Sequence, residues 1–278
     1  MNFYFRRTYR GPLSAVIFDW AGTTVDHGSR APVAAFQATF EADGVPITVT
    51  QARGPMGMAK KDHIREILKL AEVTAAWRAV KGRDWTETDV ETLYARFIPL
   101  QNEVLPNHSE LIPGVASTIG SLRERGLKLG GTTGYDRTMM DVVEPLAAAQ
   151  GYAVDPGGSV TISEVPAGRP APWMVFEAMK RLRAWPVEAV VKVGDTRADI
   201  EEGLNAGCWT VGVALTGNET GLSAAELDAL DPTQRQTLHA QATDNLARAG
   251  AHYVIESVAT LEPILDAIAT RLRAGERP

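Results

Sequence analysis

The chain has 278 residues, of which 45% are hydrophobic and 22% charged, a composition typical of a globular protein with one large or two smaller domains. A net charge of −6 gives no support for a nucleic-acid partner. No apolar run reaches the roughly 18 residues that cross a bilayer. The single cysteine, Cys208, excludes an internal disulfide, and we expect a cytoplasmic protein. The N-terminal residues 1–12 carry a short basic run with no apolar region after it, and we interpret them as an added leader.

Short apolar runs that stop at polar turns predict the strands of a buried sheet. They lie at residues 15–18, 127–133, 189–195, 209–215 and 251–257. Helical patterns separate the later runs, at residues 114–126, 136–151, 172–184 and 198–207. This alternation predicts an α/β fold with a Rossmann-like, doubly wound and mostly parallel sheet, covered by helices on both faces.

Residues 27 to about 110 break this alternation, because they show helical patterns and no clear strand. The helical patterns lie at residues 31–44, 60–73 and 86–105. An insertion directly after the first strand would cover the carboxyl edge of the sheet, where open α/β sheets bind their ligands. We therefore predict an α/β core domain of residues 1–28 and 108–278, with an inserted α-helical cap domain of residues 29–107.

Polar residues follow the predicted strands at the points where the strands end. Asp19 ends the first, Thr133 the second, and Asp195 a later one, with Asp199 four residues on. Arg169 lies between them in a proline-rich loop. Because the carboxyl ends of parallel strands meet at one edge, we expect these side chains to converge. Two carboxylates would repel each other there, and a Mg²⁺ ion would remove that repulsion.

Such a group of residues can carry out phosphoryl transfer. A carboxylate beside Mg²⁺ can attack phosphorus and form an aspartyl phosphate, while the planar fork of Arg169 suits phosphoryl oxygens and Thr133 can donate a hydrogen bond. Each residue alone has a simpler interpretation. Asp19 is a turn former, the two later aspartates start a helix, and the threonine and arginine are a helix cap and a surface charge. Their joint occurrence at successive strand ends favours the site.

Four segments resemble the successive motifs of the haloacid dehalogenase superfamily: FDWAGTT, TTGY, GRPAPW and VGDTRAD. The predicted insertion also matches the position of that superfamily's first type of cap. In its phosphatases the first motif commonly reads Asp-x-Asp, and the second Asp protonates a leaving alkoxide. Here the motif reads Asp19-Trp20-Ala21. Either the protein is impaired, or its leaving group is not an alkoxide.

The predicted cap contains a candidate amine in the segment GPMGMAKKDHIREIL. Lys60 and His63 lie three residues apart, so they share one side of a helix. A lysine can form a Schiff base with an aldehyde, and the protonated imine can accept the electron pair of a breaking carbon–phosphorus bond. An isolated helix lysine is usually solvated, and a nucleophilic one needs its pKa lowered by burial and by a cation such as Lys61 or the metal. His63 could shuttle protons or simply pack between cap and core.

Longer segments, from about residue 13 to the C-terminus, resemble the phosphonoacetaldehyde hydrolase family, also called phosphonatases. They read AVIFDWAGTTVD, PMGMAKKDH, TTGYDRTMMDVV, VPAGRPAPWM and KVGDTRADIEEG. The resemblance implies Asp19 as the nucleophile and Lys60 as the residue that forms the imine. It further implies Mg²⁺, held by Asp19, by the backbone carbonyl of Ala21 and by Asp195.

The same resemblance implies the substrate, phosphonoacetaldehyde, and further residues around it. Phosphate contacts are expected from Thr133, Gly134 and Arg169. The residues expected near the rest of the substrate are Met56, Gly57, His63 and Tyr135, with Thr196 and Asp199 in support. We also expect a homodimer that forms through the cap. Ser29 stands where some members carry a cysteine, and we expect no essential role for it.

Two other functions stay open at this point. The first is another hydrolase of the superfamily, a phosphomonoesterase or a dehalogenase. Ala21 argues against a phosphomonoesterase, and Asp195 as a metal ligand argues against a metal-free dehalogenase. The second is a non-catalytic binding protein on the same fold. The set of nucleophile, amine and metal ligands argues against it, since binding alone needs no nucleophile.

Overall fold

The structure, a computed structural model, describes residues 8–278, so the predicted leader lies partly outside the described residues. A parallel sheet forms the centre of this part of the chain, with the strand order β3-β2-β1-β4-β5-β6. Its strands are β1 (Ala15–Phe18), β2 (Lys128–Thr133), β3 (Ser159–Thr161), β4 (Val190–Gly194), β5 (Trp209–Val213) and β6 (Tyr253–Ile255). The predicted Rossmann-like α/β fold is confirmed.

Strand β1 lies in the middle of the sheet and places the chain that follows it at the centre of the carboxyl edge. It pairs with β2 on one side and β4 on the other, with Phe18 opposite both Gly131 and Val193. All four residues of β1 are fully buried. Ala15 and Ile17 pack into one hydrophobic cluster, and Val16 and Phe18 into another. A strand covered on both faces is apolar throughout, which is the pattern that predicted it.

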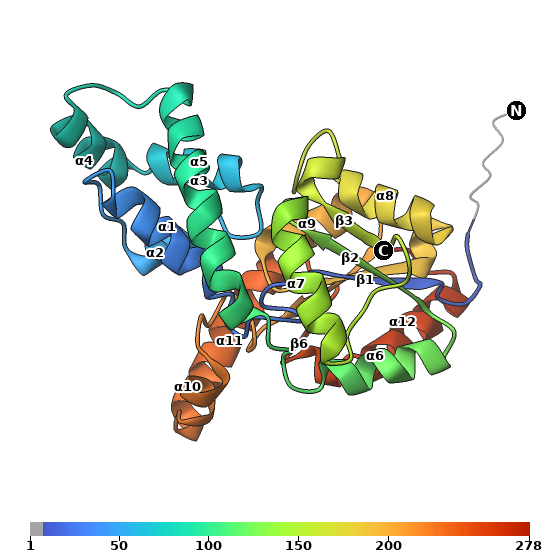
Figure 1. The fold of residues 1–278 in the computed structure, drawn as a ribbon. Coiled ribbons are helices and arrows are strands. Elements are labelled where there is room, and N and C mark those ends of the chain that lie inside the picture. The colour runs from blue at the N-terminus through green and yellow to red at the C-terminus, as the bar shows by residue number, and fades with distance from the viewer. Residues whose placement is uncertain (1–7) are drawn as a thin grey trace, which may run out of the picture.

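Helices cover both faces of the sheet (Figure 1). They are α6 (Val115–Glu124), α7 (Arg137–Ala149), α8 (Trp173–Leu182), α9 (Arg197–Ala206), α10 (Ala224–Asp228), α11 (Pro232–Arg248) and α12 (Glu262–Ala274). Helix α8 contacts β1, β2 and β3, and α9 contacts β4 and β5. Side chains of α6 and α12 pack with Val16 and Phe18 on the opposite face.

The insertion after β1 is helical, as predicted, and residues 27–110 contain no strand. Its helices are α1 (Ala31–Glu41), α2 (Val49–Arg53), α3 (Lys60–Lys69), α4 (Ala71–Lys81) and α5 (Glu87–Val104). They lie together beyond one end of the sheet, with α1 packed on α5 (Figure 1). The exact division into two domains stays a prediction.

Some elements differ from the sequence-based expectation. The helix expected over 60–73 ends at Lys69, because Leu70 leaves the helical conformation at φ −60° and ψ 130° before α4 begins. Strand β3 was not predicted, since three residues at the sheet edge give too short an apolar run. Helices α2, α10 and α11 were also missed. Only Ala242 and Leu246 of α11 are buried, which leaves almost no apolar periodicity to detect.

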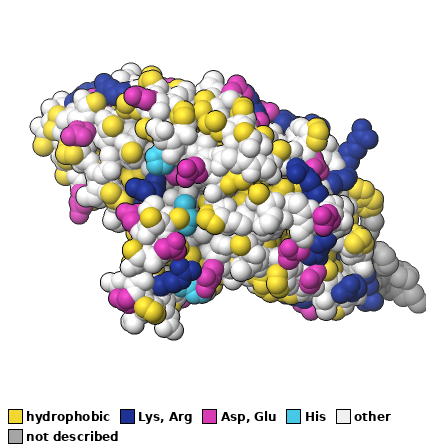
Figure 2. Space-filling view, turned by 60° about the horizontal axis from the view of Figure 1, so that its bottom comes forward, with side chains coloured by type: hydrophobic (Ala, Val, Ile, Leu, Met, Phe, Trp, Pro, Cys, Tyr) yellow, Lys and Arg dark blue, Asp and Glu magenta, His cyan; other side chains and the backbone are white. Residues whose placement is uncertain are grey.

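The surface carries both signs of charge. Figure 2 shows Lys and Arg side chains interspersed with Asp and Glu over one face of the molecule. Within residues 8–278, no helix combines the length and the apolar character that a membrane crossing requires.

Candidate active site

Asp19 directly follows β1 at the carboxyl edge of the sheet. Its backbone N–H still pairs with the carbonyl of Val193, at 2.8 Å, so the strand fixes its position. The chain then turns sharply, with the N–H groups of Thr24 and Val25 donating to the Trp20 carbonyl. The Asp19 side chain is only 7% exposed. Burial and the nearby Asp199 raise its pKa to about 6.

A second buried carboxylate, Asp195, follows β4 and lies beside the first. Oxygens of Asp19, Asp195 and Asp199 all lie within 4.8 Å of one another. Thr23 donates to Asp195 Oδ1 at 3.0 Å, and the N–H of Asn218 donates to Oδ2 at 2.8 Å. Burial, followed by repulsion from the other two carboxylates, raises the pKa of Asp195 well above its usual value. A divalent cation would relieve this repulsion.

Asp199 differs from its two neighbours because protein groups already satisfy it. Lys192 Nζ lies 2.7 Å from Oδ1, and Thr196 donates its hydroxyl to Oδ2 at 2.6 Å. Burial would raise the pKa of Asp199, but Arg169 and Lys192 outweigh that effect and lower it. Asp199 also completes the capping box of α9 with Thr196, so its interpretation as a helix-start residue is confirmed as well.

The three carboxylates form a cluster that could hold a metal ion, and Mg²⁺ is the ion that the resemblance implies. Asp19 and Asp195 are the two whose pKa is raised, and Asp19 also has an ion pair with Arg169. Ala21 lines the same cavity as Asp19, so its backbone carbonyl is a candidate for a third oxygen. One or two carboxylates with further oxygens are the ligands that Mg²⁺ takes in proteins.

The guanidinium of Arg169 joins the two sides of the site. Its Nη2 donates to Asp19 Oδ1 at 2.7 Å and to the Thr132 carbonyl at 2.9 Å. Its Nε donates to Glu202 Oε2 at 2.9 Å. Nη1 makes one long contact, 3.4 Å to the Gly57 carbonyl of the cap. With a side-chain exposure of 1%, Arg169 is held rigidly and keeps Nη1 available for a ligand.

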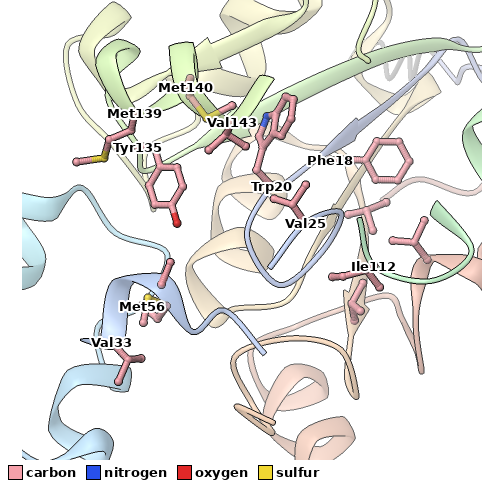
Figure 3. Close-up of a cluster of buried hydrophobic side chains, with 14 of the residues drawn as sticks. Phe18, Trp20, Val25, Val33, Met56, Ile112, Tyr135, Met139, Met140 and Val143 are labelled. Carbon is pink, nitrogen blue, oxygen red and sulfur yellow. The ribbon is translucent and has the colours of Figure 1, made fainter. Parts of the chain in front are cut away.

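Thr133 and Tyr135 close the site from the end of β2. The Thr133 hydroxyl accepts a hydrogen bond from the Tyr135 N–H at 3.1 Å, which orders the turn between them. The Tyr135 ring is buried, and its hydroxyl has no hydrogen-bond partner among the described residues. Figure 3 shows this hydroxyl pointing toward Met56, which belongs to the inserted helical segment.

Two glycines allow the cap and the core to meet closely. A side chain at Gly134 of the core would place its Cβ 2.6 Å from the Met58 carbonyl of the cap. Gly57 of the cap has φ +86°, and a Cβ there would lie 2.3 Å from the Thr196 hydroxyl of the core. Both contacts exclude any larger residue. The cap is therefore closed over the strand ends in this structure.

Lys60 opens helix α3 and projects from the cap toward the core. It is 5% exposed, and its Nζ lies 5.1 Å from the Tyr135 ring centroid and 5.6 Å from that of Phe36. Burial lowers the pKa of Lys60 to about 8; Asp19 opposes the shift and Arg169 adds to it. The cation that lowers this pKa is thus Arg169. Lys61, considered for this role from sequence, is instead paired with Glu91 at the surface.

His63 lies one turn further along α3 and is fully buried. Its Nε2 lies 2.8 Å from the Ala52 carbonyl, so Nε2 carries the hydrogen, and the lone pair on Nδ1 has no partner within residues 8–278. The ring packs on Phe36 with a centroid distance of 3.9 Å. Burial, followed by the charge of Lys60, lowers its pKa well below the usual value, so the imidazole is neutral.

A cavity of about 290 Å³, counting the part open to solvent, lies between these groups. Its walls are formed by Asp19, Ala21, Ser29, Pro32, Met56, Gly57, Lys60, Thr133, Gly134, Tyr135, Arg169 and Thr196. Most of the predicted site residues thus line one cavity. His63, Asp195 and Asp199 are buried but do not line the cavity, and His63 packs on Phe36. Ser29, set aside from sequence, is buried and belongs to the wall.

Comparisons with known proteins identify the family. A family model described as haloacid dehalogenase-like hydrolase matches residues 13–207. A phosphonoacetaldehyde hydrolase of Hahella chejuensis is 45% identical over 100% of this chain and 94% of its own length. A protein of the same name from Paraburkholderia phytofirmans is 45% identical over 96% of this chain and 99% of its own length.

The chain belongs to the phosphonoacetaldehyde hydrolase family of haloacid dehalogenase-like hydrolases. It is therefore an enzyme, a hydrolase. A crystal structure of a phosphonoacetaldehyde hydrolase-like protein from Oleispira antarctica covers 100% of both chains, with 41% identity and a TM-score of 0.97. The resemblance predicted from the sequence motifs is thereby confirmed.

Sequence reasoning missed two buried members of this phosphonoacetaldehyde hydrolase site. Glu202 and Lys192 are both fully buried and neutralise Arg169 and Asp199 respectively. A signal for Glu202 was present, since it follows Asp199 by three residues and so shares its face of the helix. Lys192 interrupts an apolar strand, and a charge inside such a strand indicates a buried partner.

Proposed function

We propose that the protein hydrolyses the carbon–phosphorus bond of phosphonoacetaldehyde, giving acetaldehyde and phosphate. One observation carries the proposal. A buried lysine of the cap, Lys60, and a buried carboxylate of the core, Asp19, line one cavity that has Ala21 in place of a second acid. A leaving group that departs as an enamine needs no proton on oxygen, so the absent acid and the present amine fit the same reaction.

The reaction begins at Lys60. Its lowered pKa leaves a useful fraction of the amine unprotonated near neutral pH. The amine adds to the aldehyde carbon, water departs, and a protonated imine forms. The lone pair on Nδ1 of neutral His63 is available on the same helix to accept and return the protons that this condensation moves.

The second stage transfers the phosphoryl group. An Asp19 oxygen attacks phosphorus in line with the carbon–phosphorus bond, and the electron pair of that bond moves into the iminium to leave an enamine on Lys60. Thr133, Gly134 and Arg169 hold the phosphoryl oxygens, with Nη1 as the free donor of the guanidinium. Met56, Gly57 and Tyr135 enclose the aldehyde end.

Asp19, the Ala21 carbonyl and Asp195 would hold Mg²⁺, and the bound ion would supply positive charge against the carboxylates and the phosphonate. Thr196 and Asp199 support that edge of the site through the hydrogen bonds of the α9 capping box. The enamine is then protonated on carbon, and water hydrolyses the resulting imine to acetaldehyde. A second water cleaves the aspartyl phosphate. The homodimer formed through the cap stays part of the proposal, and sedimentation would test it.

The deciding experiment measures acetaldehyde release from phosphonoacetaldehyde in the presence of Mg²⁺, read by an NADH-linked alcohol dehydrogenase. We expect turnover that EDTA abolishes and added Mg²⁺ restores. Hydrolysis of p-nitrophenyl phosphate without acetaldehyde release would instead identify a phosphomonoesterase. Binding of the aldehyde without turnover by folded, Mg²⁺-loaded protein would identify a binding protein.

A further inference from the structure

A loop after β5, residues 216–222, restrains one of the proposed metal ligands. The backbone N–H of Asn218 donates to Asp195 Oδ2 at 2.8 Å. A side chain at the preceding Gly217 would place its Cβ 2.2 Å from Asp195 Cβ, so the loop packs directly against this carboxylate. The loop therefore helps to hold one oxygen of Asp195, while Thr23 holds the other.

The same loop packs against the segment that enters the cap. Gly28 donates its N–H to the Thr216 carbonyl at 2.7 Å, and a hydrogen bond of 2.8 Å joins His27 Nδ1 to the Leu222 carbonyl. A Cβ at Gly28 would lie 2.3 Å from the Leu222 carbonyl oxygen. Loop 216–222 thus touches the metal-binding edge with one part and the entrance to the cap with another.

Arg53, the last residue of α2, connects the cap to this loop. Its Nη1 donates to the Gly28 carbonyl at 2.9 Å and to Asn218 Oδ1 at 3.1 Å, and its Nη2 donates to the Gly221 carbonyl at 3.2 Å. A Cβ at Gly221 would lie 2.6 Å from the guanidinium carbon, so the loop accommodates this side chain only with glycine there. One partly buried cap cation therefore bonds to three separate points at the base of the cap.

We propose that Arg53 is a positioning residue that couples closure of the cap to the placement of the Asp195 carboxylate. The bonds from Arg53 to Asn218 and Gly221 require α2 to lie against the core. When they are absent, the loop loses its cap-side anchor, and the Asn218 N–H no longer holds Asp195 Oδ2 firmly. Lys60 arrives with the cap, so the amine and an ordered metal ligand become available together. This inference rests on the proposed function for its catalytic meaning.

The matched control is Arg30, which also reaches from the cap side to the core. Its Nη1 lies 3.8 Å from Glu226 Oε2, with side-chain exposures of 44% and 55%. Exposed ion pairs of this kind contribute little. Arg53→Met removes the three charge-assisted bonds, Arg53→Lys keeps the charge and part of the bonding, and Arg30→Met removes only the exposed pair.

The test uses the full chain and two readouts besides turnover. Amide hydrogen exchange of the 216–222 peptide and titration calorimetry with Mg²⁺ alone are measured for each variant. For Arg53→Met we expect the exchange rate of this peptide and the Mg²⁺ dissociation constant each to rise by roughly tenfold. The decrease in kcat should be larger than any change in KM. Arg53→Lys should fall between Arg53→Met and wild type. Arg30→Met should stay within about twofold of wild type on every readout.

Several outcomes would overturn the proposal. Unchanged exchange in 216–222 with unchanged Mg²⁺ affinity would do so, and so would a uniform rise of exchange across the protein, which indicates only lower overall stability. Should Arg53→Met fail to fold, Asn218→Ala is the second variant, because it removes the side-chain acceptor and keeps the N–H that donates to Asp195. It must raise the exchange of the 216–222 peptide and the Mg²⁺ dissociation constant in the same direction, by a smaller factor. Wild-type protein that releases no acetaldehyde would refute the proposed function, while exchange and Mg²⁺ affinity would still decide the coupling.

Discussion

The two walls of the cavity bury charge in opposite ways. On the core wall, the fully buried Arg169 bonds to three carboxylates, those of Asp19, Asp199 and Glu202, at 2.7–3.1 Å. On the cap wall, Lys60 is equally buried but has the rings of Phe36 and Tyr135 as its near neighbours. Both cations are removed from water, yet only one of them has opposite charges within ion-pair distance.

This difference explains how one cavity can suit both a phosphoryl group and a reactive amine. Burial favours the neutral form of any ionisable group, and opposite charges at close range reverse that preference. The carboxylates therefore raise the pKa of Arg169 well above its usual value, whereas burial lowers the pKa of Lys60 to about 8. The core wall is suited to hold a phosphoryl group, and the cap wall presents an amine that can lose its proton. Cap closure brings the two walls together.

Lys60→Arg would test the cap wall most severely. Arginine keeps the positive charge and approximate length, but it stays protonated and cannot form an imine. We expect acetaldehyde release to fall by roughly 10³-fold or more, with the circular dichroism spectrum and Mg²⁺ affinity retained. Borohydride added with the aldehyde should attach a covalent adduct to wild type and none to the variant, as read by mass spectrometry.

Lys61→Arg is the matched control for this substitution. Lys61 is the next residue on α3 and pairs with Glu91 at the surface. Its replacement should leave turnover within about twofold of wild type, because exposed pairs contribute little. Near-normal activity in Lys60→Arg would refute the imine mechanism and the comparison between the walls.

Arg169→Lys would disrupt the hydrogen bonds of the core wall while keeping the positive charge. A lysine has no planar fork, so it cannot bond to Asp19, Thr132 and Glu202 together and still offer a donor to the phosphoryl group. We expect kcat to fall by roughly 10²-fold. Borohydride trapping of the imine should persist, because the amine lies on the other wall. Loss of trapping together with turnover would mean that the two walls are not separable.

The sequence predicted the core wall better than the cap wall. Asp19, Thr133 and Asp195 each lie at the carboxyl end of a strand, and strand order in a parallel sheet brings such residues together whatever the side-chain details. That reasoning needs only the fold class. The close contacts of Gly57 and Gly134 with the opposite wall depend on how the cap rests on the core, which no local pattern contains.

The environment of Lys60 shows more clearly why the sequence predicts the cap wall less well. Lys60 and Lys61 are adjacent, identical and on one helix, yet one is buried between aromatic rings and the other is paired at the surface. Only the family resemblance distinguished them before the structure was available. The ring of Phe36 comes from α1, some two dozen residues away in the chain, so its contact with Lys60 is a property of tertiary packing.

The pH dependence of imine formation would sharpen the comparison. A protonated lysine cannot attack the aldehyde, so the rate should rise with pH until the pKa of about 8 is passed and then level off. Well below that pH, the rate should change by about tenfold per pH unit for a single required deprotonation. Borohydride trapping of acetaldehyde at a series of pH values measures this midpoint directly.

Asp19→Asn gives this pH experiment its internal check. The Asp19 carboxylate opposes the shift of Lys60, so its neutralisation should lower the pKa of the lysine further and move the midpoint to lower pH. Trapping does not need the nucleophile, so it remains measurable in the variant. A midpoint near 10.4, the usual value for lysine, in wild type would contradict the lowered pKa.

The smallest effect is expected from Glu202→Gln, which removes the negative charge that helps to hold Arg169 in the core wall. Gln can still accept from Arg169 Nε, but a neutral acceptor replaces a charge-assisted one. We expect kcat to fall roughly fivefold, with KM and imine trapping little changed, because Arg169 would be held less firmly while the cap wall stays intact. Glu201→Gln is the control, since that neighbour's side chain bonds, among the described residues, only to the exposed Arg197. If both variants lose activity equally, helix α9 as a whole is responsible, and the specific role of Glu202 in holding the arginine fork would have to be abandoned.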